Sequence, residues 1–335
     1  MRIAQLQGQL LALGAKPRHA DSILRAWLQG EPLDHGRAPN PPRPLRLALP
    51  ALTAQLQGLA RLRSEHPGAD GSSRLLLELA DAQTVESVLL PRGGLCVSTQ
   101  VGCAVACLFC MTGQSGLVRQ LGSAEIVAQV VLGRSLRPVR KVVFMGMGEP
   151  AHNLGNVLEA VDLLGTAGGI GHKNLVISSV GDRRLFERLP LCRVKPALAL
   201  SLHTTRADLR AKLLPRAPRI APEDLVQLGE RYARATGYPI QYQWTLLAGI
   251  NDGDEELDGI VRLLSGHYAV MNFIPYNRVA GLDFQRPSWE RAAAMARHLH
   301  QRGILTKLRH SAGQDVEGGC GQLRARSLVK LADGA

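Results

Sequence analysis

Residues 95–113 read LCVSTQVGCAVACLFCMTG. Within this stretch Cys103, Cys107 and Cys110 form a C-x3-C-x2-C pattern, directly behind a short apolar run that is typical of a strand. Thiolates are the usual ligands of iron–sulfur clusters. Three thiolates from one short loop can hold three irons of a 4Fe-4S cube and leave the fourth iron without a protein ligand. The spacing therefore predicts a cluster loop after a strand.

The iron without a protein ligand predicts that a small molecule binds the cluster at this position. The amino and carboxylate groups of S-adenosylmethionine can chelate such an iron, and an electron from the cluster can then break the sulfonium bond and release a deoxyadenosyl radical. Phe109, just before the last cysteine, would shield the cluster from solvent. The alternatives are three unrelated buried cysteines or a structural zinc site. Structural zinc normally takes four ligands, often as two C-x2-C pairs, and the sequence has no second pair.

Strands and helices alternate from residue 95 onward. The expected strands are 95–99, 141–146, 175–178, 197–202, 240–247 and 269–274, and the expected helices are 123–134, 153–165, 182–189, 222–235 and 253–265, followed by a helix at 288–301 and a strand at 304–308. Such alternation predicts a parallel sheet covered by helices. Six units make a partial (β/α)6 barrel, in which ligands bind at the carboxyl ends of the strands.

The 335 residues suffice for one α/β barrel with a small addition. We expect an N-terminal helical module over residues 1–65, a strand pair over 66–94 that carries Glu86, and a core over 95–325 that ends in a cysteine loop. The amino terminus lacks a signal-peptide pattern and no apolar run is long enough to span a membrane, so we expect a cytoplasmic protein with reduced cysteines.

The net charge of +12 favours a polyanionic partner such as RNA, although a general surface bias is the alternative. Aromatic residues make up only 4% of the chain, which argues against a module that stacks bases on an aromatic sheet. The basic residues that could hold phosphates are Arg206, Arg210, Lys212, Arg216, Arg219, Arg324, Arg326 and Lys330. The alternative for each of them is a solvated face.

Two further segments carry candidate site residues. The segment MGMGEP at 145–150 ends a predicted strand, where glycines let backbone groups approach a ligand and Glu149 can accept a hydrogen bond from an ammonium group. The alternative is a tight turn with an exposed Glu149. Cys320 lies between glycines in GGCGQ, so it is a candidate nucleophile on a permissive loop, or else a buried structural thiol.

Together these motifs resemble a known family. The cysteine pattern with an aromatic residue before its last cysteine is similar to the signature of the radical S-adenosylmethionine superfamily. More narrowly, LCVSTQVGCAVACLFC, MGMGEP, SLH at 201–203 and CGQL at 320–323 resemble the adenine carbon-2 RNA methyltransferases and their carbon-8 relatives, over about residues 14–325. The resemblance implies a 4Fe-4S cluster on the three cysteines. It also implies S-adenosylmethionine contacts at Gly148, Glu149, Ser178, Ser201, Leu202, His203 and Asn277.

The resemblance also implies a mechanism. Carbon 2 of adenine is not a nucleophile, so a radical route is needed. Cys320 is expected to take a methyl group first, and a second cofactor molecule then generates a methylene radical that adds to the adenine. Cys96 is expected to release the product through a transient disulfide with Cys320, and Glu86 is expected to be the proton acceptor.

The substrate implied is an unpaired or flipped adenosine, because carbon 2 lies on the pairing edge. The family's typical target is 23S ribosomal RNA, with some transfer RNAs as a second class, and a flavodoxin is the kind of electron donor expected. The segment at Pro215, where the family usually has Pro–Ile–Asn or Pro–Val–Asn, departs from the family pattern, as do Arg278 and Ala312, so the RNA site stays open. The alternatives are carbon-8 methylation and a non-catalytic iron–sulfur RNA-binding protein. The presence of Cys96, Cys320 and Glu86 together argues against the non-catalytic protein.

Overall fold

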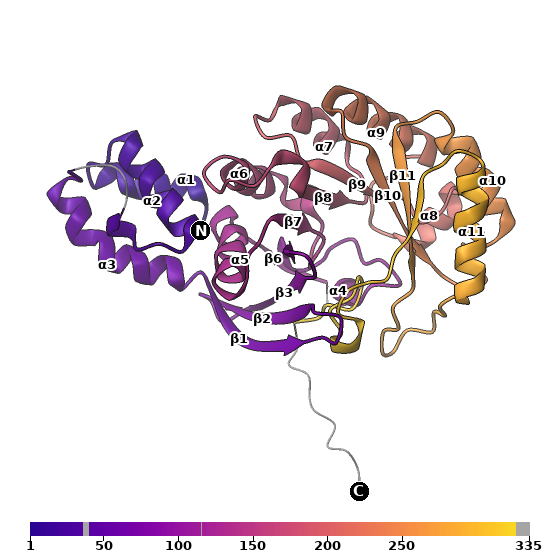
Figure 1. The fold of residues 1–335 in the computed structure, drawn as a ribbon, viewed down its shortest axis with the longest axis horizontal. Coiled ribbons are helices and arrows are strands. Elements are labelled where there is room, and N and C mark those ends of the chain that lie inside the picture. Colours follow the sequence, from indigo (N-terminus) through magenta and orange to yellow (C-terminus); the bar gives the residue numbers. More distant parts are fainter. Residues whose placement is uncertain (36–39, 115, 326–335) are drawn as a thin grey trace, which may run out of the picture.

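The computed structural model describes residues 1–35, 40–114 and 116–325, so Arg326 and Lys330 lie outside the described residues. The described residues form one ten-stranded sheet in the order β1-β2-β3-β4-β7-β8-β9-β10-β11-β12, and a small sheet of β5 and β6. Helices α5, α6, α7, α9, α10 and α11 follow the curved sheet around its outside, as Figure 1 shows. No helix among these residues is long and apolar enough to cross a membrane.

In the ten-stranded sheet, the strands from β4 onward are parallel to one another. They are β4 (Gly94–Cys96), β7 (Lys141–Phe144), β8 (Leu175–Ser179), β9 (Ala197–Ser201), β10 (Ile240–Leu246), β11 (Ala269–Pro275) and β12 (Thr306–Leu308). Strands such as β9 are apolar along most of their length because helices cover one face and the barrel core the other. The predicted partial barrel is confirmed, with β12 as the additional strand.

The covering helices lie close to their expected ranges. They are α5 (Ser123–Leu136), α6 (Leu154–Gly165), α7 (Arg183–Arg188), α9 (Pro222–Thr236), α10 (Asp254–Leu264) and α11 (Trp289–Gln301). The sequence reasoning missed four short elements beside the site, namely β5 (Gln100–Gly102), α4 (Met111–Gln114), β6 (Leu117–Gln120) and α8 (Ala207–Leu213). Elements this short carry too little periodic pattern to be recognised from sequence.

The N-terminal helices are α1 (Ile3–Ala12), α2 (Pro17–Gln29) and α3 (Arg43–Gln57), which stand at one end of the molecule in Figure 1. Helical structure does not continue to residue 65, because β1 (Ala60–Pro67) begins inside that stretch and pairs antiparallel with β2 (Ser73–Leu79). Strand β2 forms a hairpin with β3 (Thr84–Leu90), and β3 pairs with β4. This antiparallel ribbon therefore extends the barrel sheet and places β3 next to the strand that carries Cys96.

Candidate active site

The three motif cysteines lie in one loop between β5 and β6. The backbone N–H of Cys103 donates to the carbonyl oxygen of Gly116 at 2.9 Å, which closes the loop at its base. Gly102 has a φ of +77°, and a Cβ at this position would lie 1.9 Å from the Gly116 oxygen. Only glycine fits there, because both the backbone angle and the close approach of the two strands exclude a side chain.

The thiols of Cys103, Cys107 and Cys110 pack against an apolar cluster that includes Phe109 and Leu214. Burial raises the pKa of each thiol, that of Cys103 to about 12, so these groups are protonated near neutrality unless a metal binds them. In the described part of the chain, no three His, Cys, Asp or Glu side chains converge on the position of a single ion. Three thiols on one short loop, packed against apolar side chains, fit an iron–sulfur cluster, because each thiolate can hold a separate iron.

His203 follows β9 and packs on the cluster loop. Its ring lies edge to face with that of Phe109, with a centroid distance of 4.9 Å. Its Nδ1 accepts a hydrogen bond from the backbone N–H of Thr245 at 3.0 Å. Burial, with a smaller contribution from the charge of Arg210, lowers the pKa of His203 to about 3, so the imidazole is neutral. His203 therefore supports the loop as an apolar ring and a hydrogen-bond acceptor.

The segment MGMGEP ends β7 and turns its carboxylate inward. Glu149 is 4% exposed, so the alternative of an exposed turn residue is wrong. Its carboxylate accepts backbone N–H groups of Ala151 at 2.9 Å and Val180 at 3.0 Å. Burial raises its pKa, which makes a cationic ligand favourable beside it. Gly148 has a φ of +103°, and its missing side chain makes room for Gln100.

The other predicted cofactor contacts also lie at strand ends. Ser178 and Ser201 are partly buried near the ends of β8 and β9, and Leu202 is fully buried with its N–H bonded to the carbonyl of Gln243 at 3.0 Å. Asn277 lies after β11, but its side-chain amide donates to Ser311 Oγ at 2.8 Å and to the Cys320 carbonyl at 2.9 Å. Asn277 therefore holds the C-terminal cysteine loop in this structure.

The C-terminal segment docks on the cluster loop. The backbone N–H of Met111 donates to the carbonyl of Gly321 at 2.8 Å, and Thr112 Oγ1 donates to the carbonyl of Leu323 at 2.6 Å. These bonds hold Cys320 beside the loop of Cys110, although the two cysteines are separated by more than two hundred residues.

A cavity of about 570 Å³ lies inside the barrel and brings three thiols together. Cys96 from β4, Cys110 from the cluster loop and Cys320 from the C-terminal segment all line it. Burial, and then the proximity of Cys320, raise the pKa of Cys96 to about 12. Burial in the cavity wall also raises the pKa of Cys320, although part of its side chain is exposed to the cavity. All six cysteines of the sequence lie in the described residues and are free thiols.

Glu86 lies on β3 beside the strand of Cys96, but it does not line this cavity. Its side chain is fully buried and forms an ion pair with the equally buried Arg74. The second carboxylate oxygen accepts the backbone N–H groups of Arg324 at 2.7 Å and Ala325 at 3.0 Å. Glu86 thus fastens the segment that follows Cys320 to the antiparallel ribbon.

The basic residues after β9 separate into two groups. Arg206, Lys212, Arg216 and Arg219 are exposed, and Arg206 pairs with Glu255 and Glu256. Arg210 is buried, and its guanidinium donates to the carbonyl of Ser201 at 3.1 Å, so it stabilises a strand end and is not available to a phosphate. Arg324 pairs with Glu317.

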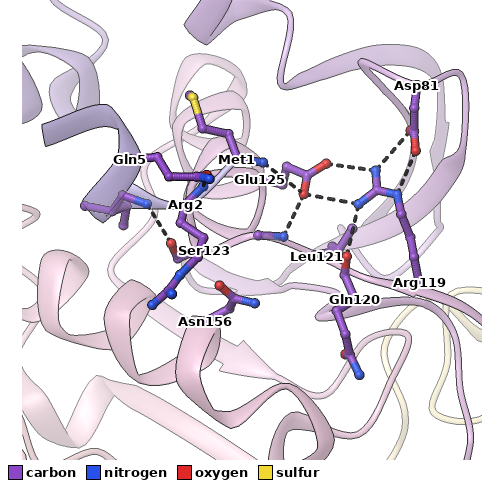
Figure 2. Close-up of polar contacts among 12 residues, drawn as sticks. Met1, Arg2, Gln5, Asp81, Arg119, Gln120, Leu121, Ser123, Glu125 and Asn156 are labelled. Carbon is purple, nitrogen blue, oxygen red and sulfur yellow. Dashed lines mark hydrogen bonds and ion pairs between the residues drawn. The ribbon is translucent and has the colours of Figure 1, made fainter. Parts of the chain in front are cut away.

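Arg119, on β6, was missed by the sequence reasoning. Figure 2 shows its guanidinium between Asp81 in the β2–β3 turn and Glu125 at the start of α5. It donates to Asp81 Oδ2 at 2.7 Å and to Glu125 Oε1 at 2.8 Å, and the Asp81 bond lowers the pKa of that carboxyl. Arg119 ties the base of the cluster loop to two other elements. A lone charged residue on a short strand carries no sequence signal of such a role.

Comparisons with known proteins agree with this geometry. The sequence model described as the radical SAM superfamily matches residues 97–264, half of the chain, from the end of β4 to the end of α10. The chain belongs to the radical SAM superfamily. Its cofactors are a 4Fe-4S cluster and S-adenosylmethionine. The loop of Cys103, Cys107 and Cys110 lies within the matched residues and is the candidate site for the cluster.

Relatives and solved structures extend the match over nearly the whole chain. A probable RNA methyltransferase from Methylibium petroleiphilum is 75% identical and covers 98% of this chain and 94% of its own length. A second probable RNA methyltransferase, from Azoarcus sp., is 74% identical, and the match covers 99% of this chain and 96% of the relative. The crystal structure of a radical SAM methyltransferase from Sphaerobacter thermophilus has a TM-score of 0.84 and 32% identity, and covers 97% of this chain and 98% of that one.

Proposed function

We propose that this protein methylates carbon 2 of an adenine in RNA through a methylated Cys320. The observation that carries the proposal is the shared cavity, in which Cys96 and Cys320 lie beside the cluster ligand Cys110. A cluster alone needs only the cysteine loop, whereas two further thiols at the same cavity fit a covalent route with a resolving thiol. The names of the relatives from Methylibium and Azoarcus support RNA as the substrate.

When bound, the cluster and S-adenosylmethionine supply a methyl group and a hydrogen-abstracting organic radical, with electrons from a one-electron donor such as a flavodoxin. The residues of the chain do the rest. Cys320 loses its proton and its sulfur attacks the cofactor's methyl group, so that the cofactor leaves as a neutral thioether. The methylated Cys320 then stands in the cavity, where the carbon it carries can reach an unpaired adenine.

Release of the product requires Cys96. Its thiolate attacks the sulfur of Cys320 and supplies the electron pair of the new disulfide bond. The electrons of the broken carbon–sulfur bond stay on the former methyl carbon, which takes up a proton. A two-electron thiol reductant must afterwards restore both cysteines, as is expected in the reducing cytoplasm.

Glu86 is the proposed acceptor of the proton that leaves carbon 2. The radical adduct loses this proton and also one electron, which passes to a one-electron acceptor such as the oxidised form of the electron donor, before Cys96 attacks. Its carboxylate is held by Arg74 and by the N–H groups of Arg324 and Ala325, so it becomes available to the base when this C-terminal stretch moves. Such a movement would free Glu86 and reposition the Cys320 loop together, because both contacts involve the same segment.

The RNA proposed first is 23S ribosomal RNA, with transfer RNA as the second class. Two of the positions that depart from the family pattern lie close to the C-terminal loop. Ala312 lines the cavity, and the carbonyl of Arg278 accepts the side-chain amide of Gln322 at 3.0 Å. These two differences lie beside the proposed substrate cavity and leave the thiols unchanged. Their position supports an effect on the choice of RNA and not on the reaction.

The deciding experiment isolates the Cys96→Ala variant after anaerobic expression, with Cys192→Ala as the matched control. Cys96→Ala is expected to carry a covalent RNA adduct on Cys320, because the resolving thiol is missing. Mass spectrometry of nucleosides from cells with and without the gene identifies 2-methyladenosine or its 8-methyl isomer in each RNA class. A Cys96→Ala protein free of RNA, together with unchanged nucleosides, contradicts the proposed function.

A further inference from the structure

The cavity that holds the thiols has a second chemical character, which the proposed reaction does not use. Three basic side chains, those of Arg92, Lys141 and Arg309, line it, and we call them the cationic wall. Lys141 is the first residue of β7, and Arg309 follows the last residue of β12. None of the predicted cofactor contacts is among the described residues that line this cavity.

The cationic wall joins the two edges of the open barrel. Strands β4 and β7 are neighbours inside the sheet, with Gly94 opposite Lys141, whereas β12 is an end strand that is separated from β7 by four others. Curvature of the sheet brings these strands to one cavity, in which Lys141 and Arg309 lie close enough for their charges to interact. The charge of Arg309 also lowers the pKa of Cys320 against the larger effect of burial, so this cation lies close to the thiol of Cys320.

Within the described ranges, the cationic wall has no ion-pair partner. Among the described residues, no carboxylate forms an ion pair with Arg92, Lys141 or Arg309, whereas Arg119 and Arg193 are paired. Asp70 is the one acidic residue among the described residues that line the cavity, and it already accepts hydrogen bonds from Ser72 and from the N–H of Gly313. Burial first, and then the charges of Arg309 and Lys307, lower the pKa of Lys141. An anion in the cavity would relieve this repulsion.

We propose that Lys141 and Arg309 bind a backbone phosphate of the RNA nucleotide whose adenine lies at Cys320. The proposal rests on the proposed function and adds the residues that place the substrate. The cavity volume of about 570 Å³ lies within the range of small-ligand sites, so it can admit a flipped nucleotide with its phosphate. Phosphate contacts fix register and carry no sequence information, and this pair would therefore position any adenosine that enters.

The test measures binding of a short fluorescein-labelled single-stranded RNA that contains one adenosine, by anisotropy on the anaerobic holoenzyme. Salt is varied between about 50 and 200 mM for the wild type, Lys141→Gln and Arg309→Gln. Lys173→Gln is the matched control, because Lys173 is exposed just before β8 and does not line the cavity. Lys141→Arg keeps the charge and tests for rescue.

Each charge-removing variant is expected to weaken binding several-fold and to reduce the slope of log K against log salt by about 0.7, the value for one single-strand phosphate contact. Lys173→Gln and Lys141→Arg should keep the wild-type slope. Wild-type slopes in both Lys141→Gln and Arg309→Gln, with the cluster absorbance intact, overturn the proposal.

A parallel methylation assay separates this proposal from the proposed function. If the wild type methylates the RNA while the variants keep its salt slope, the phosphate site is wrong and the function stands. If the slopes change as expected but no methyladenosine forms, the phosphate site stands and the function is wrong. A wild type that does not bind RNA overturns both.

Discussion

The backbone N–H of Met111 donates a 2.8 Å hydrogen bond to the carbonyl oxygen of Gly321. Met111 follows Cys110 and Gly321 follows Cys320, so this bond directly joins the loop of the three motif cysteines to the loop of Cys320. The distance between Cys320 and the loop of Cys110 is thus set by main-chain contacts. The side chains of Thr112 and Asn277 also hold this segment, through hydrogen bonds to the carbonyls of Leu323 and Cys320.

Replacing Cys103 by Ala is expected to remove the brown absorbance of the cluster and most of the bound iron, because one corner of the cube loses its protein ligand. Cys192→Ala is the control, since Cys192 lies on the outside of the barrel after α7 and its thiol donates only to the Arg188 carbonyl. Iron content and visible absorbance after anaerobic reconstitution check this. Full iron retention in Cys103→Ala would remove Cys103 from the ligand set.

Asn277→Ala is expected to loosen the Cys320 loop. The variant loses hydrogen bonds to Ser311 and to the Cys320 carbonyl, at a cost of about 1–3 kcal/mol for buried groups left unpaired. If Asn277 acts mainly through the loop, methylation of Cys320 falls while the affinity for S-adenosylmethionine is retained. Equilibrium cofactor binding and mass spectrometry of the Cys320 peptide separate the two effects. A loss of cofactor affinity alone would instead assign Asn277 to direct contact.

Arg119→Gln is expected to destabilise the base of the cluster loop. The charged hydrogen bonds to Asp81 and Glu125 are partly shielded from solvent, and their loss should lower the free energy of unfolding by about 1–3 kcal/mol. Arg193→Gln breaks the well-exposed pair with Asp162, which solvent screens, and should have a much smaller effect. Urea denaturation and the rate of iron release check both variants. Equal behaviour of the two would refute a role for Arg119 in holding the loop.

The buried His203 is expected to make stability depend on pH. Its folded pKa of about 3 lies below the unfolded value of 6.5, so the unfolded chain binds the extra proton and stability falls as the pH drops below about 6.5. Between pH 7.5 and 5 this group alone should cost about 2 kcal/mol. His203→Asn removes the titration and tolerates the φ of +63°. Anaerobic urea denaturation at both pH values should show a smaller loss in the variant, and an identical loss would argue against a buried neutral His203.

Gly148→Ala is expected to disturb the cofactor turn. An added Cβ would lie 2.6 Å from the Cβ of Gln100, at a φ of +103° that other residues rarely adopt. We expect a loss of about 1–3 kcal/mol in stability and a weaker affinity for S-adenosylmethionine. Gly155→Ala is the control, because Gly155 lies in α6 with open space around its missing side chain. Thermal unfolding and cofactor titration check the pair, and the prediction fails if both variants match the wild type.

The sequence by itself indicated the two cofactors and the parallel barrel. The spacing of Cys103, Cys107 and Cys110 is local, and the apolar runs of strands such as β8 and β9 reflect burial on both faces, so both features can be read without coordinates. The positions of Glu149 at a strand end and of Cys320 between glycines were likewise visible as local patterns.

Only the tertiary structure decided how distant segments meet. It placed Cys320 beside Cys110, turned Glu86 toward Arg74 and the C-terminal segment, and buried Arg210 under a strand end. It also brought Lys141 and Arg309 to one wall from strands that are not neighbours in the sheet. The physical reason is that such contacts depend on sheet curvature and long-range packing, which leave no periodic or local signature in the order of residues.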